Sequence, residues 1–160
     1  MKKFVLWGTA LLVFAASNVM IIRKEHTLVD GRTMLLRLAP RDPRSLMQGD
    51  YMTLRYALAR EIPETQLEDK GCIVVYLNEH QVAEFIRIHR DEKLGSGEHL
   101  LFYRNRGGLR LGAESFFFQE GNADLYAGAW YGELKVDESG ASVLIGLRGE
   151  DFSPLGRKAE

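Results

Sequence analysis

The chain has 160 residues, 46% of them hydrophobic, with a net charge of −1 and one cysteine. The single cysteine excludes an internal disulfide and any metal site built from several cysteines. Residues 27–160 hold 17 basic and 21 acidic side chains, a balance that argues against nucleic-acid binding, which needs a basic face. This stretch is long enough for one domain with its own hydrophobic core.

Residues 4–22 form an uncharged, mostly apolar run between Lys2-Lys3 and Arg23-Lys24. As a helix the run would be about 28 Å long, close to the roughly 30 Å hydrocarbon thickness of a bilayer. The alternative is a cleaved secretory signal, with Ala15-Ala16-Ser17 as a weak cleavage site. The apolar run continues beyond that site to Ile22, which favours an uncleaved anchor. We therefore expect a membrane anchor at residues 1–26 and a single domain at 27–160.

The orientation of this anchor follows from its flanking charges. A short basic start before the first apolar helix is typical of an anchor whose N-terminus stays in the cytoplasm. Arg32, Arg37 and Arg41 would favour the opposite orientation, but long domains are translocated largely regardless of their charge. We expect the domain to lie outside the cytoplasm.

The domain is predicted to be mainly β, an antiparallel sheet, barrel or sandwich with one short α-helix. Short strand-like runs separated by turn residues, many of them glycines, are typical of such folds. The predicted strands cover residues 32–39, 51–58, 72–77, 82–89, 99–104, 109–118, 133–136 and 141–148. In the last of these, Val143, Ile145 and Leu147 share one face at period two. The polar segment 61–71 is predicted to be a loop.

The soluble helix is predicted at residues 122–130. Asn122 is a suitable N-cap, Asp124 lies in the first turn, and the apolar residues that follow have helical spacing. Such a helix would pack on the open face of the sheet or close one end of a barrel.

Residues 49–56 read Gly-Asp-Tyr-Met-Thr-Leu-Arg-Tyr. Gly49 suits a turn, and Asp50 can accept backbone hydrogen bonds or pair with a nearby arginine at the entry to the strand. Period-two alternation places Leu54 and Tyr56 on the buried face, with the Tyr56 hydroxyl needing a partner. Tyr51 and Arg55 then point the other way. The motif is interpreted as a fold-defining turn and core strand, with a docking surface or a catalytic site as alternatives.

This string resembles the GDYXXLXY family of small bacterial membrane-anchored proteins, a group without an assigned activity. The resemblance extends to Arg41-Asp42-Pro43 and to Glu-x-x-Phe-x-x-Glu-Gly, here from Glu114 through Glu120 to Gly121. It implies one helix in the bacterial inner membrane, a domain on the periplasmic side and a multi-pass membrane protein as partner. It implies no reaction and no cofactor.

Two enzymatic arrangements are weaker hypotheses. Ser45 could act as a nucleophile with Lys70 or Lys93 as base, as in anchored signal peptidases, provided the amine is desolvated. Glu114, Glu120 and Asp124 could form an acidic cluster for a cation or for acid–base chemistry. The four histidines are scattered without zinc-site spacing. The sequence thus favours a non-catalytic, membrane-tethered accessory subunit over a small anchored hydrolase or an envelope ligand-binding protein.

Overall fold

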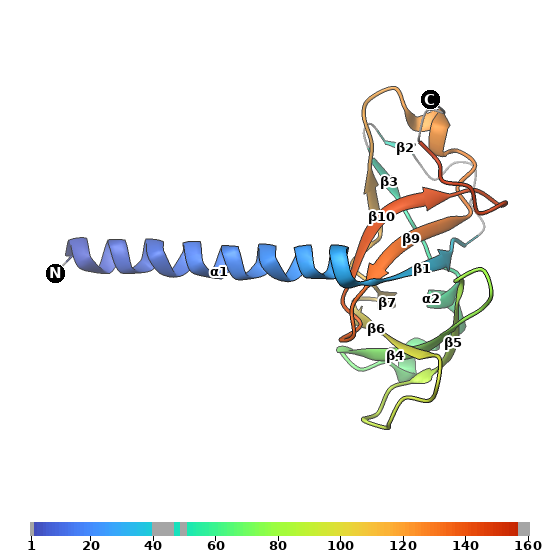
Figure 1. The fold of residues 1–160 in the computed structure, drawn as a ribbon, viewed down its shortest axis with the longest axis horizontal. Helices are drawn as coiled ribbons and strands as arrows, with labels where there is room; N and C mark the ends of the chain where they lie inside the picture. The colour runs from blue at the N-terminus through green and yellow to red at the C-terminus, as the bar shows by residue number, and fades with distance from the viewer. Residues whose placement is uncertain (1, 40–46, 49–50, 157–160) are drawn as a thin grey trace.

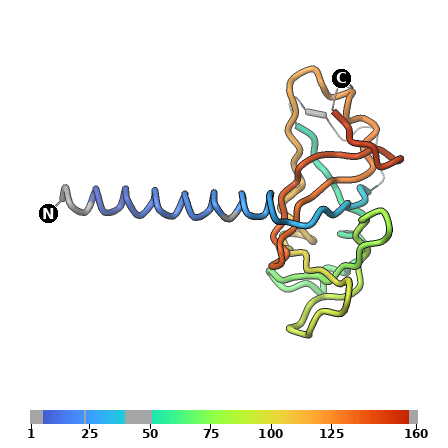
Figure 2. The backbone as a smooth tube through the Cα atoms, viewed as in Figure 1, coloured from blue at the N-terminus to red at the C-terminus, as the bar shows by residue number. Residues whose placement is uncertain are grey.

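The computed structural model describes residues 2–39, 47–48 and 51–156. A long N-terminal helix, α1 (Lys2–Asp30), projects from one side of a domain made mostly of strands (Figure 1). All the strands lie at one end of this helix, so the molecule has the form of a rod attached to a β domain (Figure 2). The fold is therefore mainly β behind one apolar helix, as the sequence predicts.

Helix α1 continues past the predicted end of the apolar run at Ile22 to Asp30. The most apolar 18-residue window within Leu6–Asp30 has a mean hydropathy of 1.6, and none of that window is buried by the domain. Within the described chain this is the one helix long and apolar enough to cross a membrane, a test that an N-terminal signal sequence also passes.

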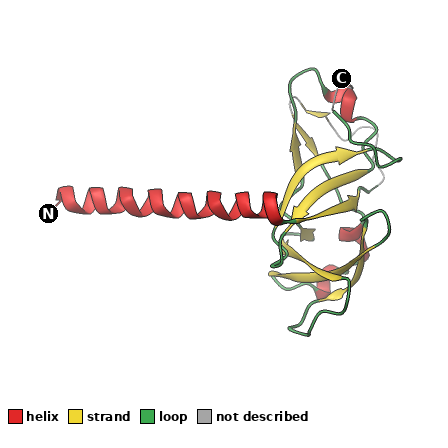
Figure 3. Ribbon diagram, in the orientation of Figure 1, coloured by secondary structure: helices red, strands yellow, loops and turns green. Residues whose placement is uncertain are grey.

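The strands form three antiparallel sheets, yellow in Figure 3. Their orders are β1-β9-β10, β2-β3-β8 and β5-β4-β6-β7. Isolated bridges connect neighbouring sheets: Leu38 pairs with Tyr56, and Leu35 pairs with Val82. The strands are β1 (Arg32–Arg37), β2 (Met47–Gln48), β3 (Tyr51–Thr53), β4 (Lys70–Leu77), β5 (Ala83–Ile88), β6 (Glu98–Asn105), β7 (Leu109–Arg110), β8 (Ser115–Phe117), β9 (Tyr131–Val136) and β10 (Ser142–Arg148).

One continuous hydrophobic core lies between the sheets. It takes residues from every part of the domain, and its largest fully buried side chains are Tyr103, Met34, Leu36, Met52, Ile73, Leu101, Leu134 and Leu147. Burying so much apolar surface is the main stabilising contribution in a domain of this size. Strands of all three sheets therefore pack on the same core.

Two predicted hairpins are confirmed. Strands β4 and β5 pair antiparallel across the turn at Asn78, whose side-chain oxygen accepts hydrogen bonds from the His80 and Val82 amides at 3.0 Å each. Strands β9 and β10 pair across a turn in which Gly140 has φ +84°. Positive φ is readily adopted by glycine, which explains why this turn can be recognised from sequence.

The predicted strand at 109–118 is wrong, because the chain bends and divides it into two strands. Strand β7 pairs with β6, whereas β8 crosses to β3 in another sheet. At the bend, Gly112 has φ +77° and the Glu114 carboxylate accepts hydrogen bonds from the Leu111 and Gly112 amides. A side chain that captures two backbone amides competes with continuation of the strand.

The predicted helix at 122–130 is also wrong, since only a short 3-10 helix, η2 (Ala123–Tyr126), forms there. The side chain of Asn122 makes no capping hydrogen bond. The Trp130 amide donates to the Arg148 carbonyl at 2.9 Å, and the Trp130 carbonyl accepts from the Leu38 amide at 2.8 Å. The sheet therefore takes the backbone groups that a longer helix would have used.

Three further predictions need correction. The segment 61–71 is not simply a loop, because it contains the end of α2 (Leu58–Glu61), the 3-10 helix η1 (Glu64–Gln66) and the start of β4. Leu58 begins α2, so it does not continue the strand predicted at 51–58. A register shift between Leu144 and Gly146 interrupts the period-two pattern of β10, leaving Ile145 42% exposed while Leu144 packs on the core.

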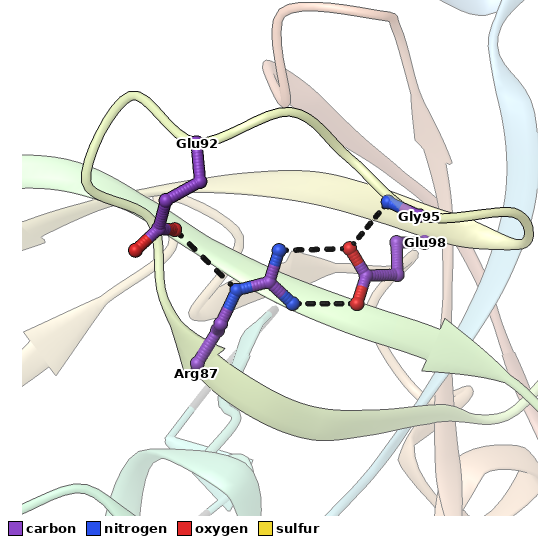
Figure 4. Close-up of polar contacts among 4 residues, drawn as sticks. All are labelled: Arg87, Glu92, Gly95 and Glu98. Atoms are coloured by element: carbon purple, nitrogen blue, oxygen red, sulfur yellow. Dashed lines mark hydrogen bonds and ion pairs between the residues drawn. The ribbon is translucent and has the colours of Figure 1, made fainter.

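An ion pair connects β5 and β6, the two strands that flank β4. Arg87 on β5 donates two hydrogen bonds to Glu98 on β6, at 2.5 and 2.8 Å, and the Gly95 amide adds a third at 2.8 Å (Figure 4). Glu92 lies farther from the Arg87 guanidinium, at 3.4 Å. The hydrogen bonds from Arg87 and then from the Gly95 amide lower the pKa of Glu98 from 4.5 to about 2.

We expect this pair to shape the acid unfolding of the domain. Because the pKa of Glu98 is lower in the folded state, its contribution to stability is complete above about pH 4.5 and is lost as the pH falls toward 2. Glu98→Gln should flatten the pH dependence of the unfolding midpoint in that window, measured by urea denaturation. Glu92→Gln, the matched control, should change it less. If the unfolding midpoints of the parent chain and of Glu98→Gln change with pH in the same way, the pair of Arg87 and Glu98 does not control acid unfolding.

Candidate functional site: the exposed face of the motif strand

Strand β3 carries Tyr51, Met52 and Thr53 of the sequence motif and pairs with β8. The pairs are Tyr51 with Phe117, Met52 with Phe116 and Thr53 with Ser115. Because side chains alternate along a strand, Met52 is fully buried while Tyr51 and Thr53 are exposed. The alternation predicted for residues 51–56 is confirmed by this burial pattern.

The outer face of this pair presents two aromatic rings to solvent. Tyr51 is 38% exposed and Phe117 is 73% exposed, with ring centroids 5.8 Å apart. We call Tyr51 and Phe117 the aromatic pair. An exposed phenylalanine beside an exposed tyrosine is typical of surfaces that dock another molecule, where both residue types are enriched. The sequence shows three consecutive aromatic residues, Phe116-Phe117-Phe118. Only the register of β8 with β3 shows that the middle one, Phe117, points outward.

Tyr56, the last motif residue, has a structural role. Its side chain is buried, and its hydroxyl donates a 2.6 Å hydrogen bond to the Ala113 carbonyl. Burial, with a smaller effect from the negative charge of Glu114, raises the pKa of Tyr56 well above its ordinary value of 10. The hydroxyl stays neutral at physiological pH and serves as a buried donor.

Leu54 and Glu114 tie the motif to the bend before β8. The Leu54 side chain is buried, and its amide donates to the Glu114 carbonyl at 2.7 Å. The Glu114 carboxylate accepts hydrogen bonds from Leu111 at 2.5 Å and from Gly112 at 3.2 Å. The Glu114 carboxylate therefore fixes the backbone of the bend, which is a structural role for the first residue of the Glu-x-x-Phe-x-x-Glu-Gly pattern.

Glu120 and Gly121 lie beyond β8 on an exposed turn, where Gly121 has φ +80°. The predicted acidic cluster with Glu114 and Asp124 does not form. Among residues that the structure describes, no group of three His, Cys, Asp or Glu side chains is placed to hold a metal ion.

Arg55 and Trp130 are exposed, as expected for a surface patch. Trp130 is 40% exposed, and the Arg37 guanidinium lies over its ring, 6.0 Å from the centroid. The Arg55 carbonyl accepts a 2.7 Å hydrogen bond from the Ala39 amide, so its backbone is fixed while its side chain faces solvent.

The remaining predicted site residues lie outside the described residues. They are Arg41, Asp42, Pro43, Gly49 and Asp50, together with the candidate nucleophile Ser45. Both candidate bases, Lys70 and Lys93, are exposed. Exposed amines lack the desolvation that a neutral lysine base requires. Neither Lys70 nor Lys93 therefore has the buried environment that the serine–lysine hypothesis requires.

Comparison with known proteins gives one result. A search of curated proteins and a search of solved structures returned no significant match. The model of the GDYXXLXY protein family matches residues 13–147, which include β3, Tyr56, Glu114, β9 and all but the last residue of β10. With most of its length covered by this match, the chain belongs to the GDYXXLXY family.

Proposed function

We propose that the protein is a non-catalytic interaction domain tethered to the bacterial inner membrane by α1, with the domain on the periplasmic side. In this proposal it is an accessory subunit of a multi-pass membrane protein. The observation that carries the proposal is the way α1 enters the domain. A cleavable leader needs no contact with the mature protein, whereas the end of α1 is built into the fold.

Three contacts join the end of α1 and the adjoining Gly31 to the β9–β10 hairpin. Thr27 is only 3% exposed, and its hydroxyl donates to the Asp137 carboxylate at 2.8 Å. The Lys24 ammonium donates to the Ser142 carbonyl at 3.2 Å, and the Lys135 ammonium donates to the Gly31 carbonyl at 3.0 Å. The junction has no flexible linker, because β1 starts at Arg32, two residues after α1 ends. Such a junction supports a domain held at a fixed height above the membrane.

The aromatic pair supplies a surface for the proposed partner. Large apolar side chains exposed together on a sheet face are unusual unless something covers them. Aromatic anchors also supply much of the binding energy in protein interfaces. A rigid anchor beside a multi-pass protein would keep this face at one level relative to the partner's periplasmic loops.

The test is recovery of a multi-pass partner from the native membrane in mild detergent. We expect the parent chain to co-purify a multi-pass protein in stoichiometric amount, and Tyr51→Ser/Phe117→Ser to lose most of it. Ile86→Ser/Leu94→Ser is the control, since these residues are also large, apolar and exposed, at 42% and 41%. All variants should unfold at similar urea concentrations, because exposed substitutions change stability little.

Two outcomes would contradict the proposal. Absence of any stoichiometric partner from the parent sample would remove the accessory-subunit function. If Tyr51→Ser/Phe117→Ser recovers as much of the partner as the parent chain does, the contact lies outside the aromatic pair. A chain in which residues 4–22 are replaced by an unrelated membrane helix would then show whether α1 itself makes the contact.

A further inference from the structure

A groove lies where the end of α1, the β6–β7 hairpin and the start of β10 meet. It has a volume of about 710 Å³. Its lining divides into an apolar part, which includes Phe102, Leu111 and Ala141, and a basic part made by Lys24, Arg104, Arg106 and Arg110. We call these four cationic residues the basic groove. The β6–β7 hairpin, which carries three of these residues, lies near the end of α1 (Figure 1).

The positive charge of the basic groove is not neutralised within the described chain. No salt bridge joins any of its four cations to another described residue. Glu114 is the one acidic residue in the lining, so one negative charge lies among the four positive charges and the groove keeps an excess of positive charge. Because residues 27–160 carry more acidic than basic side chains, the groove is a local concentration of positive charge. Such a concentration attracts an anion.

The position of the groove along α1 indicates which anion reaches it. Lys24 follows the last apolar residue, Ile22, by two positions, which is about 3 Å along a helix. The headgroup layer on each side of a bilayer is roughly 5–8 Å thick. With the apolar run inside the hydrocarbon, Lys24 lies at headgroup level, and its hydrogen bond to Ser142 brings the groove to the same level.

We propose that the basic groove binds the headgroup phosphate of an anionic phospholipid in the leaflet where α1 leaves the membrane. Arginines form paired hydrogen bonds with phosphate oxygens, and each can supply charge without losing its proton. The apolar lining suits the glycerol backbone and the upper part of an acyl chain. This proposal rests on α1 remaining attached as an anchor, which is part of the proposed function. It adds a lipid ligand that does not depend on a protein partner.

The experiment is native mass spectrometry of the full-length chain in mild detergent, titrated with phosphatidylglycerol or phosphatidylcholine. We expect a one-to-one adduct with phosphatidylglycerol at concentrations where phosphatidylcholine gives none. Arg104→Gln/Arg106→Gln/Arg110→Gln should weaken this adduct by about 100-fold, since each basic residue near an anionic surface contributes about fivefold. The matched control is Arg60→Gln/Arg90→Gln/Lys93→Gln, which removes the same charge from exposed positions outside the groove and should leave the adduct unchanged.

The single variant Arg106→Gln tests the groove even if the triple variant fails to fold. Arg106 is exposed in the β6–β7 turn, and its loss should weaken the adduct about fivefold without changing the unfolding midpoint. Unchanged adducts in both groove variants would overturn the proposal. Equal binding of phosphatidylcholine would also overturn it.

Two more outcomes separate this proposal from its alternatives. If millimolar glycerol phosphate displaces the lipid, the groove binds a free anion and the lipid assignment is wrong. If no lipid binds, yet the groove variants lose a co-purifying protein, the groove docks an acidic protein segment instead. The intact mass of the same sample reports on α1: a mass lacking the N-terminal helix overturns the anchor and the lipid site together, whereas a full mass without an adduct overturns the lipid site alone.

Discussion

Tyr56→Ala is expected to lower the free energy of unfolding by about 3–5 kcal/mol, the usual cost of removing a large buried aromatic side chain. The ring fills a core position against β9, where a β-carbon added to Gly132 would lie 3.1 Å from its edge. The hydroxyl satisfies the Ala113 carbonyl at 2.6 Å. Urea denaturation of the full-length chain in mild detergent measures the loss.

Two further variants separate the contribution of the Tyr56 ring from that of its hydroxyl and compare Tyr56 with the exposed Tyr51. Tyr56→Phe keeps the ring but leaves the Ala113 carbonyl without its donor, at a cost of about 1–3 kcal/mol. Tyr51→Ala removes the other tyrosine of the motif, which is exposed, and should change stability by no more than about 0.5 kcal/mol. Similar losses for Tyr51→Ala and Tyr56→Ala would contradict the division of the motif into a structural and a surface residue.

Gly31→Ala is expected to disturb the junction between α1 and the domain. A β-carbon at Gly31 would overlap the Thr27 carbonyl oxygen and lie 3.2 Å from the Val136 amide nitrogen. These are backbone atoms, so the end of the helix must shift, which also strains the hydrogen bond between Thr27 and Asp137. We expect a loss of about 1–3 kcal/mol, typical of overpacking at a buried position.

The shift can be measured directly as a distance. Spin labels at one position in the apolar part of α1 and one position on β4 should give a narrow distance distribution in the parent chain and a broader one in Gly31→Ala. Gly128→Ala is the control, because no atom lies within 4 Å of its added β-carbon. A narrow, unchanged distribution in Gly31→Ala would show that the junction tolerates the side chain and does not fix the domain.

The features predicted correctly from the sequence depend on local patterns. The apolar run of α1 needs only composition and length. The glycine-containing turns between the strands need only residues that adopt positive φ, as Gly107, Gly108 and Gly140 do. The alternation through Tyr51, Met52 and Leu54 places each side chain because period two is a property of the strand itself.

The failures share a different cause, competition from distant segments. The helix expected at 122–130 competes with hydrogen bonds that Trp130 donates to Arg148 on β10 and accepts from Leu38, which directly follows β1. The strand expected at 109–118 is divided because β8 pairs with the distant strand β3, while the Glu114 side chain holds the bend through local hydrogen bonds. Local propensity is a weak preference that tertiary contacts override.

The sequence by itself determined the long apolar N-terminal helix, the β class, the buried face of the motif and the exposure of Tyr51 and Arg55. Only the tertiary structure decided that Phe117 joins Tyr51, because cross-strand neighbours depend on register. The same holds for the basic groove, where Lys24 lies far along the chain from Arg104, Arg106 and Arg110. Charges distant in sequence gather only when the core fixes the strands that carry them, since no local pattern encodes that proximity.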